Sequence, residues 1–258
     1  MDLGIKGKKA IVCASSRGLG YGCAEALAKA GVDITICART KEDIQIAAKK
    51  LSEFGVKIST VVCDVTTDDG KYELLKACDS PDILINNAGG PPPGVWSNWD
   101  REDFIKALDA NMLTPITLMK KVLPIMIEKE WGRIVNITSQ AVKAPVAALG
   151  LSNSARTGLT GYVAGTSRQV ANFGVTINNL LPGMHDTKRL VDLDKALSIE
   201  KNLSFEKARE LRKETIPVGR YGSIEEFGNT CAFLCSKHAG FIVGQNILLD
   251  GGAVNSTI

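Results

Sequence analysis

Residues 10–20 read AIVCASSRGLG: a short apolar run, a turn with two glycines, and the start of an Ala-rich stretch over 20–30. A strand, such a turn and a helix N-terminus together form an anion-binding site, because free N–H groups and the helix dipole point at the same place. Glycine is needed where the backbone approaches a phosphate without a Cβ in between. The stretch therefore predicts a turn that binds the pyrophosphate of a dinucleotide.

Outward from this turn, strand and helix signals alternate to the end of the chain. Unbroken runs of Val, Ile and Leu predict strands that are buried on both faces. The predicted strands are 10–13, 33–37, 57–63, 82–85, 133–137, 176–180 and 246–249, and helices are clearest over 20–30 and 41–54. Helices between strands imply right-handed crossovers and a parallel sheet. We predict an α/β fold: one Rossmann-type, doubly wound parallel sheet of about seven strands, with helices on both faces, in a single domain over 1–258.

Composition narrows the class of protein. The 258 residues suit one large domain, and 31 basic against 28 acidic side chains leave a net charge of +3, which gives no footprint for nucleic acid or an anionic membrane. Neither a signal peptide nor a membrane-spanning apolar run is expected. The seven scattered cysteines predict reduced thiols in a cytoplasmic protein, and Cys231 and Cys235 lack the second pair that a metal site would need.

Further motifs follow the turn in order, each at a predicted strand end or near the C-terminus. They are Asp64-Val65, Asn86-Asn87-Ala88-Gly89, Pro182-Gly183-Met184-His185-Asp186-Thr187, Pro217-Val218-Gly219-Arg220 and Gly244-Gln245 with Asp250-Gly251-Gly252. With these motifs the whole chain resembles the short-chain dehydrogenase/reductase family, and within it the ketoacyl-carrier-protein reductases most. The resemblance implies a nicotinamide cofactor, a small-molecule carbonyl or alcohol substrate, and a homo-oligomer, expected to be a tetramer.

The glycine turn departs from the family's Thr-Gly-x-x-x-Gly-x-Gly. Gly18 and Gly20 match, but Cys13 stands for the Thr and Ala14 for the first Gly, where Ala is tolerated if its φ is negative. The turn and the matching motifs supply the candidate cofactor-binding residues. These are Ser15, Ser16, Arg17, Gly18, Leu19, Gly20, Arg39, Asp64, Val65, Asn87, Ala88, Gly89, Pro182, Gly183, Met184 and Thr187.

The end of the second strand predicts which cofactor is used. An NAD enzyme carries an acid there to bind the ribose diol, whereas this chain has Ala38 followed by Arg39, with Arg17 in the turn. Two guanidinium groups favour a dianionic phosphate. We therefore predict NADP(H), with NADPH bound at least about tenfold more tightly than NADH.

The catalytic pattern of the family is only half present. The resemblance assigns Ser139 to the Ser that polarises a carbonyl and Asn111 to the helix-bending Asn. At the usual spacing after Ser139, however, the Tyr-x-x-x-Lys of the family reads Ser152 and Arg156. The only Tyr-x-x-x-Lys, Tyr72 to Lys76, precedes the fourth strand and is interpreted as accidental.

The exchange alters the chemistry that is expected. An alcohol is a far weaker acid than a phenol, and an arginine cannot relay protons. Arg156 can still hold ribose hydroxyls or clamp a substrate carboxylate, and Ser152, four residues earlier on the helix, shares its face. The candidate catalytic residues are thus Ser139, Ser152, Arg156 and Asn111.

Three sources of the proton remain open. His185 lies in the nicotinamide-side motif, although a surface loop histidine is an equal interpretation. Lys143 follows Ser139 in its loop. A water chain held by Ser139, Ser152 and Asn111 is the third. Tyr162, further along the same helix, is expected to pack in the core.

We predict an NADP(H)-dependent oxidoreductase that transfers a hydride between the nicotinamide and a carbonyl or hydroxyl substrate, 3-oxoacyl compounds among the candidates, through an atypical proton-transfer site. The alternative is a catalytically silent protein that binds or senses nicotinamide nucleotide. The polar segment 188–215 follows the sixth strand at the sheet edge where ligands bind, and we expect it to form a substrate lid.

Overall fold

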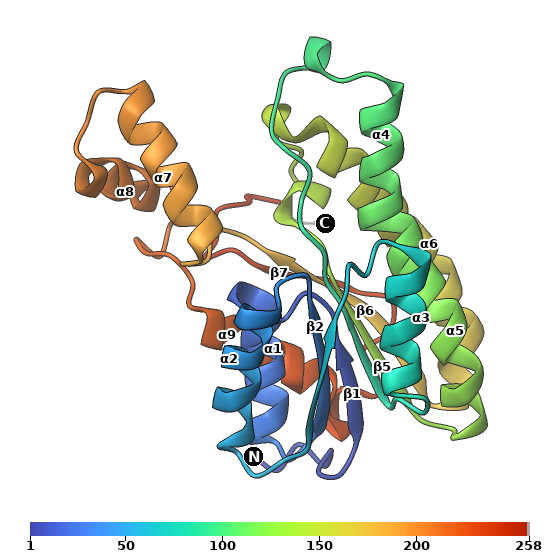
Figure 1. Cartoon of the computed structure of the whole chain (residues 1–258). Helices are drawn as coiled ribbons and strands as arrows, with labels where there is room; N and C mark the ends of the chain where they lie inside the picture. The colour runs from blue at the N-terminus through green and yellow to red at the C-terminus, as the bar shows by residue number, and fades with distance from the viewer. Residues whose placement is uncertain (257–258) are drawn as a thin grey trace.

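Seven parallel strands form one sheet in the computed structural model, which describes residues 1–256 (Figure 1). Their order across the sheet is β3-β2-β1-β4-β5-β6-β7. The strands are β1 Lys9–Val12, β2 Asp33–Ala38, β3 Ile58–Val62, β4 Ile83–Asn86, β5 Gly132–Ile137, β6 Val175–Pro182 and β7 Asn246–Leu249. Each lies within two residues of its predicted position, so the predicted sheet is confirmed.

Helices cover both faces of the sheet (Figure 1). The first face carries α1 Gly18–Lys29, α2 Lys41–Ser52 and α9 Ile224–Leu234; the second carries α3 Asp68–Ala77, α4 Arg101–Leu108, α5 Thr114–Glu128 and α6 Gly150–Val170. Separate apolar clusters fill the two layers, one centred on α1 and α9 and the other on α5 and α6. This three-layer arrangement confirms the doubly wound fold.

Two glycines allow α1 to pack directly on α9. A Cβ on Gly22 would clash with the carbonyl oxygen of Ile224, and a Cβ on Gly228 would clash with the carbonyl oxygen of Gly22. The backbones can approach this closely only without side chains at these two positions. The close contact brings α1, and with it the glycine turn, to a defined place at the edge of the sheet.

The strand order reverses between β1 and β4, which run next to each other in parallel. In open α/β sheets, ligands bind in the crevice outside the carboxyl ends of the strands at such a switch point. Every motif from the glycine turn to Thr187 follows a strand, so the topology gathers these motifs at this edge.

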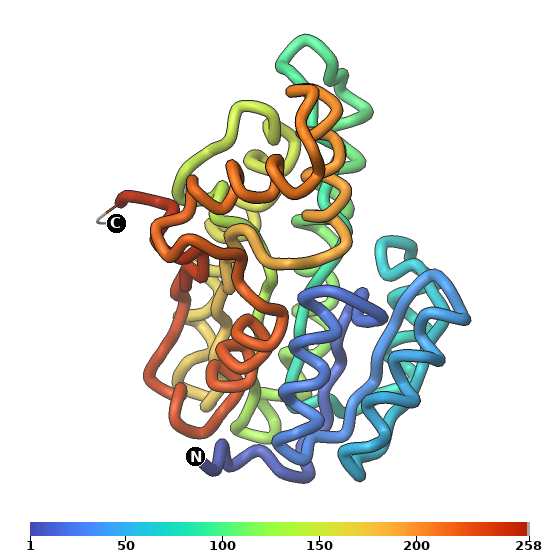
Figure 2. The backbone as a smooth tube through the Cα atoms, turned by 90° about the vertical axis from the view of Figure 1, so that its left-hand side faces the viewer, coloured from blue at the N-terminus to red at the C-terminus, as the bar shows by residue number. Residues whose placement is uncertain are grey.

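Two helices, α7 Lys188–Glu200 and α8 Phe205–Glu214, form a hairpin that stands away from the layers. Figures 1 and 2 both show it projecting at the carboxyl edge of the sheet. The fully buried Asp194 of α7 accepts hydrogen bonds from Arg212 Nε of α8 at 2.7 Å and from the Tyr221 hydroxyl at 3.0 Å. The segment predicted as one polar unit is therefore two helices that are joined by a buried charge network.

The described residues carry no group of His, Cys, Asp or Glu side chains placed to hold a metal. Within the same residues, no helix is both long and apolar enough to cross a membrane. All seven cysteines are free, and only Cys63 is partly exposed.

Candidate active site

The glycine turn is braced by its neighbours. The Ser15 N–H donates to the Cys37 carbonyl at 3.0 Å, and the buried Ser15 hydroxyl donates to the Val12 carbonyl at 2.7 Å. Asn87 Nδ2, beyond the end of β4, donates to the Ala14 carbonyl at 3.1 Å. A Cβ on Gly20 would lie only 2.8 Å from the same Asn87 nitrogen. Ser15 and Asn87 therefore shape the turn with their side chains, and Gly20 leaves the room that this requires.

Ala14 does not have the negative φ that would make it an easy replacement for glycine. Its φ is +47°, in the left-handed region that L-residues other than Gly, Asn and Asp rarely adopt. The Asn87 hydrogen bond to its carbonyl and the strand before it hold this conformation. The turn thus holds Ala14 in a left-handed conformation at a cost in strain.

Ala14→Gly should raise the free energy of unfolding by about 1 kcal/mol, because the left-handed conformation costs an alanine roughly 1–2 kcal/mol and part of that gain is lost to the entropy of an added glycine. Urea unfolding measures the change. Ala48→Gly, in the middle of α2, is the matched control and should lower stability by about 1 kcal/mol. A destabilised Ala14→Gly protein would contradict the strain.

The two arginines predicted to bind a 2′-phosphate both lie exposed at the carboxyl edge. Arg17 is not free, because its guanidinium lies 3.6 Å from the Asp43 carboxylate of α2. Arg39 lies close to Asp64. Partial burial acts to raise the pKa of Asp64, but hydrogen bonds from Thr66 and the charge of Arg39 lower it overall, so the carboxylate stays ionised.

The segment that follows β6 lies beside the glycine turn. The Thr187 methyl group would be 3.7 Å from a Cβ on Gly18. The Gly183 N–H donates to the Leu249 carbonyl at 2.7 Å, and a Cβ on Gly183 would come within 2.6 Å of the Asp250 Cα. The C-terminal motif thus supports the 182–187 segment through Leu249 and Asp250. The predicted cofactor residues that follow β1 and β6 therefore lie next to each other.

Ser152 and Arg156 form a hydrogen-bonded pair on one face of α6. Arg156 Nε donates to Ser152 Oγ at 3.2 Å, and Arg156 Nη1 donates to the Ile137 carbonyl at 2.8 Å. Exposed fractions of only 7% and 8% show that both side chains are buried. Ile137 ends β5 two residues before Ser139, so the guanidinium is held at the strand end that carries the candidate catalytic serine.

Asn111 reaches the same place from a break in the helix between α4 and α5. Residues Asp109–Leu113 form a π-helical turn, a distortion that is frequent at functional sites. Asn111 Nδ2 donates to the Gly89 carbonyl at 3.3 Å, and the buried Oδ1 has no hydrogen-bond partner within residues 1–256. The wider turn therefore presents an amide oxygen to the site.

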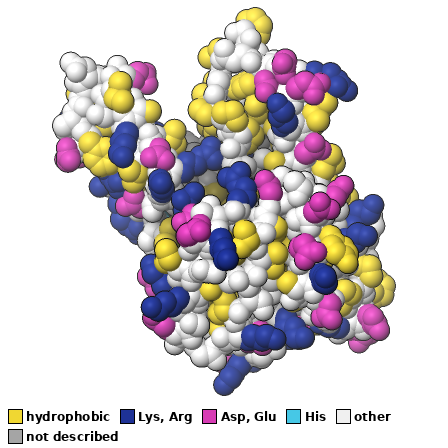
Figure 3. Space-filling view, viewed as in Figure 1, with side chains coloured by type: hydrophobic (Ala, Val, Ile, Leu, Met, Phe, Trp, Pro, Cys, Tyr) yellow, Lys and Arg dark blue, Asp and Glu magenta, His cyan; other side chains and the backbone are white. Residues whose placement is uncertain are grey.

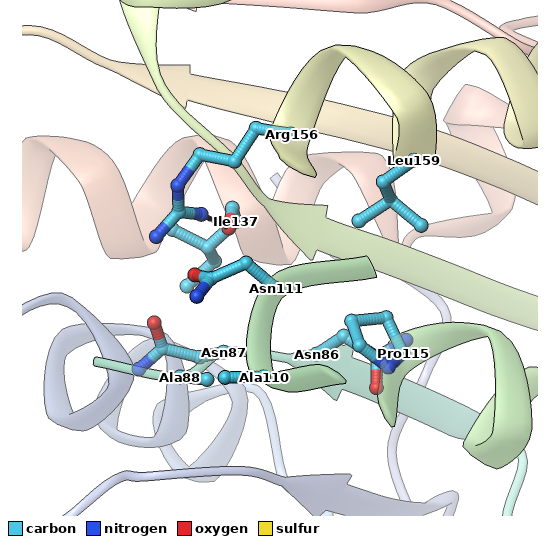
Figure 4. A pocket seen from close by; sticks show the side chains of 9 residues that line it. All are labelled: Asn86, Asn87, Ala88, Ala110, Asn111, Pro115, Ile137, Arg156 and Leu159. Carbon is cyan, nitrogen blue, oxygen red and sulfur yellow. Dashed lines mark hydrogen bonds between the residues drawn. The ribbon is translucent and has the colours of Figure 1, made fainter. Parts of the chain in front are cut away.

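A small pocket joins these groups (Figure 4). Figure 4 shows Asn111 and Arg156 pointing into the same space from opposite sides. The lining residues are Asn86, Asn87, Ala88, Ala110, Asn111, Pro115, Ile137, Arg156 and Leu159. The structure thus brings together Asn111, Arg156 and the residues after β4, as the sequence predicted.

Burial is the main cause, and the nearby positive charge of Arg189 a second cause, of a lowered Arg156 pKa of about 10. The guanidinium is still protonated near neutral pH. Of its five N–H groups, two make the hydrogen bonds described above. Arg156 is therefore a fixed cation with donors to spare, and it cannot serve as a base or a proton relay.

Sequence reasoning missed Arg189, which lies in the first turn of α7 with its guanidinium directly on Gly90. The signal was available, because Arg189 follows Thr187 by two residues. Figure 3 shows a hollow between the α7–α8 hairpin and the part of the molecule around α4, with Lys and Arg side chains gathered on its floor. This hollow suits an anionic ligand.

His185 is not the surface loop histidine that one interpretation expected, because only 6% of it is exposed. Its ring packs edge-on against Phe227 of α9, with centroids 5.2 Å apart, and covers Gly222. Phe227 belongs to the α1–α9 layer, whereas Arg156 comes from the opposite face of the sheet. Burial lowers the pKa of His185. The ring is thus part of the core, which argues against a role as the proton donor.

The other side chains considered for proton transfer differ in their surroundings. Lys143 is half-buried after Ser139, where its backbone N–H donates to the Gln140 carbonyl at 2.9 Å. Tyr162 packs against the α5–α6 layer, which confirms the expected core role. Tyr72 is 64% exposed on α3 and lines neither the glycine turn nor the pocket with Arg156, which agrees with the interpretation of the Tyr72–Lys76 match as accidental.

Comparison with known proteins agrees with the fold and the motifs. The family model described as enoyl-(acyl carrier protein) reductase matches residues 13–254. The 3-oxoacyl-[acyl-carrier-protein] reductase FabG of Aquifex aeolicus is 32% identical over 98% of this chain and 99% of its own length. L-sorbose reductase from Gluconobacter frateurii, solved with NADPH and L-sorbose, superposes with a TM-score of 0.94 at 27% identity, over 99% of this chain and 100% of that one. A 3-oxoacyl (acyl-carrier-protein) reductase from Agrobacterium tumefaciens C58, solved with NADP, gives 0.88 at 25% identity, over 97% and 95%. The chain belongs to the short-chain dehydrogenase/reductase family, as its motifs indicated.

Proposed function

We propose that the protein is an NADP(H)-dependent oxidoreductase that moves a hydride between the nicotinamide and a carbonyl or hydroxyl carbon of a small molecule. The observation that carries the proposal is the Arg156–Ser152 pair. Both side chains are buried, and Arg156 bonds to the Ile137 carbonyl at the end of β5 and lines a pocket together with Asn111. An ordered, mutually hydrogen-bonded replacement of the family's usual pair favours a working site over decay.

The residues present fit a dinucleotide. The glycine turn leads directly into α1, and a Cβ on Gly18, the first residue of that helix, would meet only the Thr187 side chain, at 3.7 Å, so the helix N-terminus where a pyrophosphate would lie is open. Around the other half of the site, Thr138 Oγ1 and Gln140 Oε1 are buried without a hydrogen-bond partner among residues 1–256. Such atoms are costly unless a ligand supplies donors, as ribose hydroxyls and a carboxamide would.

NADP(H) rather than NAD(H) is supported by the end of β2 and by the relatives. Ala38 replaces the acid that would repel a 2′-phosphate, and Arg39 beside it is exposed. The reductases from Gluconobacter frateurii and Agrobacterium tumefaciens were solved with NADPH and NADP, respectively. When bound, the reduced nicotinamide supplies the hydride.

Ser139 holds the substrate oxygen in this mechanism. Its Oγ accepts a hydrogen bond from the Ala141 N–H at 3.1 Å, which orients the hydroxyl and leaves its proton to donate. Arg156 is held by the carbonyl of Ile137, which precedes Ser139 by two residues. Its guanidinium adds positive charge where an oxyanion would develop. Donors that are oriented before the reaction are usually the largest single contribution to such catalysis.

Ser152 passes the proton. Because its Oγ accepts from the cationic Arg156, its own O–H is polarised and left to donate. Water bound to Asn111 Oδ1 replaces the proton. An alcohol in place of a phenol is a poor general acid, and general acid catalysis contributes roughly 10²–10⁴-fold, so we expect slow turnover.

The same proposal includes a substrate lid and a location in the cell. The α7–α8 hairpin acts as the substrate lid, since it projects at the carboxyl edge of the sheet (Figure 2), its Arg189 lies against Gly90, and buried Asp194 stiffens it. Free thiols throughout the described chain fit a cytoplasmic location.

The protein should be a homo-oligomer, with a tetramer expected. On α6, Gly161 and Gly165 are exposed, and a Cβ on either would meet nothing within 4 Å, which leaves a flat face for close packing of a second copy. Light scattering at micromolar concentration measures the mass. A monomer alone would contradict this expectation.

The proposed function is tested by NADPH oxidation against a panel of ketones, ketoacyl thioesters and keto acids. We expect slow oxidation with at least one class of substrate. NADPH binding in a fluorescence titration without turnover on any member would instead support a silent binding or sensor protein. Failure to bind NADPH would contradict both functions.

A further inference from the structure

Arg189 lies against the loop that continues from the pocket residues Asn86, Asn87 and Ala88. Its guanidinium rests on Gly90, where a Cβ would clash with Nη1 and approach Cζ to 3.1 Å. The carbonyl of neighbouring Gly89 accepts a hydrogen bond from Asn111, which lines the pocket together with Arg156. The contacts therefore run from Arg189 through Gly90 and Gly89 to the wall of the site.

Neither guanidinium has a carboxylate partner. Arg156 bonds only to Ser152 and to a backbone carbonyl, and within residues 1–256 neither it nor Arg189 forms an ion pair. Other arginines of the same region are all paired: Arg209 with Asp186, Arg212 with Asp194, and Arg220 with Glu226. Arg156 and Arg189 thus differ from their paired neighbours on α8 and before α9, and Arg156 does so although it is buried.

The contacts through Gly90, Gly89 and Asn111 bring the charge of Arg189 toward Arg156, and this charge contributes to the lowered pKa of Arg156. Two cations held together without an anion repel each other, and one of them is buried, so the arrangement is unfavourable by itself. An oxyanion that enters between them would remove both penalties. Guanidinium groups bind flat carboxylates through paired hydrogen bonds, which gives direction as well as charge.

We propose that Arg156 and Arg189 together bind a carboxylate of the substrate, so that the substrate is a keto acid or a hydroxy acid. This rests on the proposed function only for the reaction performed, because anion binding itself requires no turnover. Arg156 holds the end of the carboxylate near Ser139, and Arg189 closes on it from the first turn of α7. Since Asp194 holds α7 to α8, binding of the acid also draws the lid toward the pocket.

Calorimetric titration of the NADP⁺-saturated protein tests the proposal. The probes are pyruvate, benzoylformate and 2-oxoglutarate, each beside its methyl ester (the dimethyl ester for 2-oxoglutarate), which retains the keto group and removes the charge. For at least one pair we expect the acid to bind at least about tenfold more tightly than the ester. Arg189→Ala should abolish most of that preference, and Arg189→Lys should restore part of it.

Two further variants separate the effect of the position of the Arg189 guanidinium from the effect of positive charge in general. Gly90→Ala keeps every charge but pushes the guanidinium of Arg189 away, so it should weaken acid binding in the same direction. Lys188→Ala removes an exposed cation from the adjacent position and should leave the ratio of acid to ester unchanged. NADPH affinity, measured by fluorescence, should be equal in all of these proteins.

Several results would overturn the assignment. They are esters that bind as tightly as their acids, an acid preference that survives Arg189→Ala, or an Arg189→Ala protein whose defect is in NADPH binding. Displacement of the bound acid by an equal concentration of inorganic phosphate would point to a phosphate ester instead of a carboxylate. If acids bind as expected but no NADPH is oxidised with any carbonyl compound, the anion site stands and the proposed reaction fails.

Discussion

Restoring the pair usual in the family, by Ser152→Tyr together with Arg156→Lys, should lower kcat/KM on the best substrate by about 100-fold rather than raise it. Ser152 is only 7% exposed and its oxygen lies 3.2 Å from Arg156 Nε, so a phenol ring has no room without displacing the guanidinium. Overpacking a filled site costs about 1–3 kcal/mol.

The Arg156→Lys half of the double variant adds to the loss of kcat/KM. Arg156 bonds to Ser152 and to the Ile137 carbonyl through different nitrogens, and a single ammonium group cannot reproduce the spread of a guanidinium. A hydrogen bond to a charged group contributes about 1.5–3 kcal/mol, so removing the second donor by itself should be measurable.

Steady-state kinetics on the double variant and three single variants separate these effects. Arg156→Ala should raise KM or weaken cofactor binding, because it removes the cation and leaves the Ile137 carbonyl without its donor. Arg156→Lys should have a smaller effect on KM and on cofactor binding than Arg156→Ala. Ser152→Ala keeps the volume small and should lower kcat with little change in KM, because it removes the proton path. A clear gain of activity in the double variant would show instead that Ser152 and Arg156 are relics of a lost catalytic pair.

Ala38→Asp should weaken NADPH binding by about 100-fold and reverse the preference of the wild-type protein, which we expect to favour NADPH at least about tenfold. Ala38 ends β2, immediately before the exposed Arg39. A carboxylate there would repel a 2′-phosphate and would bind the hydroxyl groups of a ribose without one. It would also pair with Arg39 and so remove the cation.

Fluorescence titration with NADPH and NADH measures both affinities. Ala38→Asn is the matched control, because asparagine has the size of aspartate without its charge. It should change the preference for NADPH over NADH only slightly. Arg39→Ala should weaken NADPH binding alone. Arg17→Ala should have a smaller effect, because Arg17 is already 3.6 Å from Asp43. Equal affinity of the wild-type protein for the two nucleotides would contradict the assignment of NADP(H).

The amino-acid sequence by itself determined the sheet and the place of every motif. Strands buried on both faces must be continuous apolar runs, and parallel strands bring all their carboxyl ends to one edge. For this reason the sequence alone places Asn87, Ser139 and Thr187 at one edge of the sheet. The spacing from Ser139 to Ser152 and Arg156 also predicted a shared helix face, because α-helical geometry depends on local sequence alone.

Only the tertiary structure decided how individual side chains are used, because contacts between distant segments leave no local pattern. The positive φ of Ala14 is held by Asn87, 73 residues away. Asp43 competes for Arg17, Phe227 takes His185 into the core, and Gly90 accepts the guanidinium of Arg189. Each depends on the crossing of helices and loops above the sheet, where packing of backbone against backbone places charges to within a few ångströms. Strand and helix periodicity carries no information at that scale.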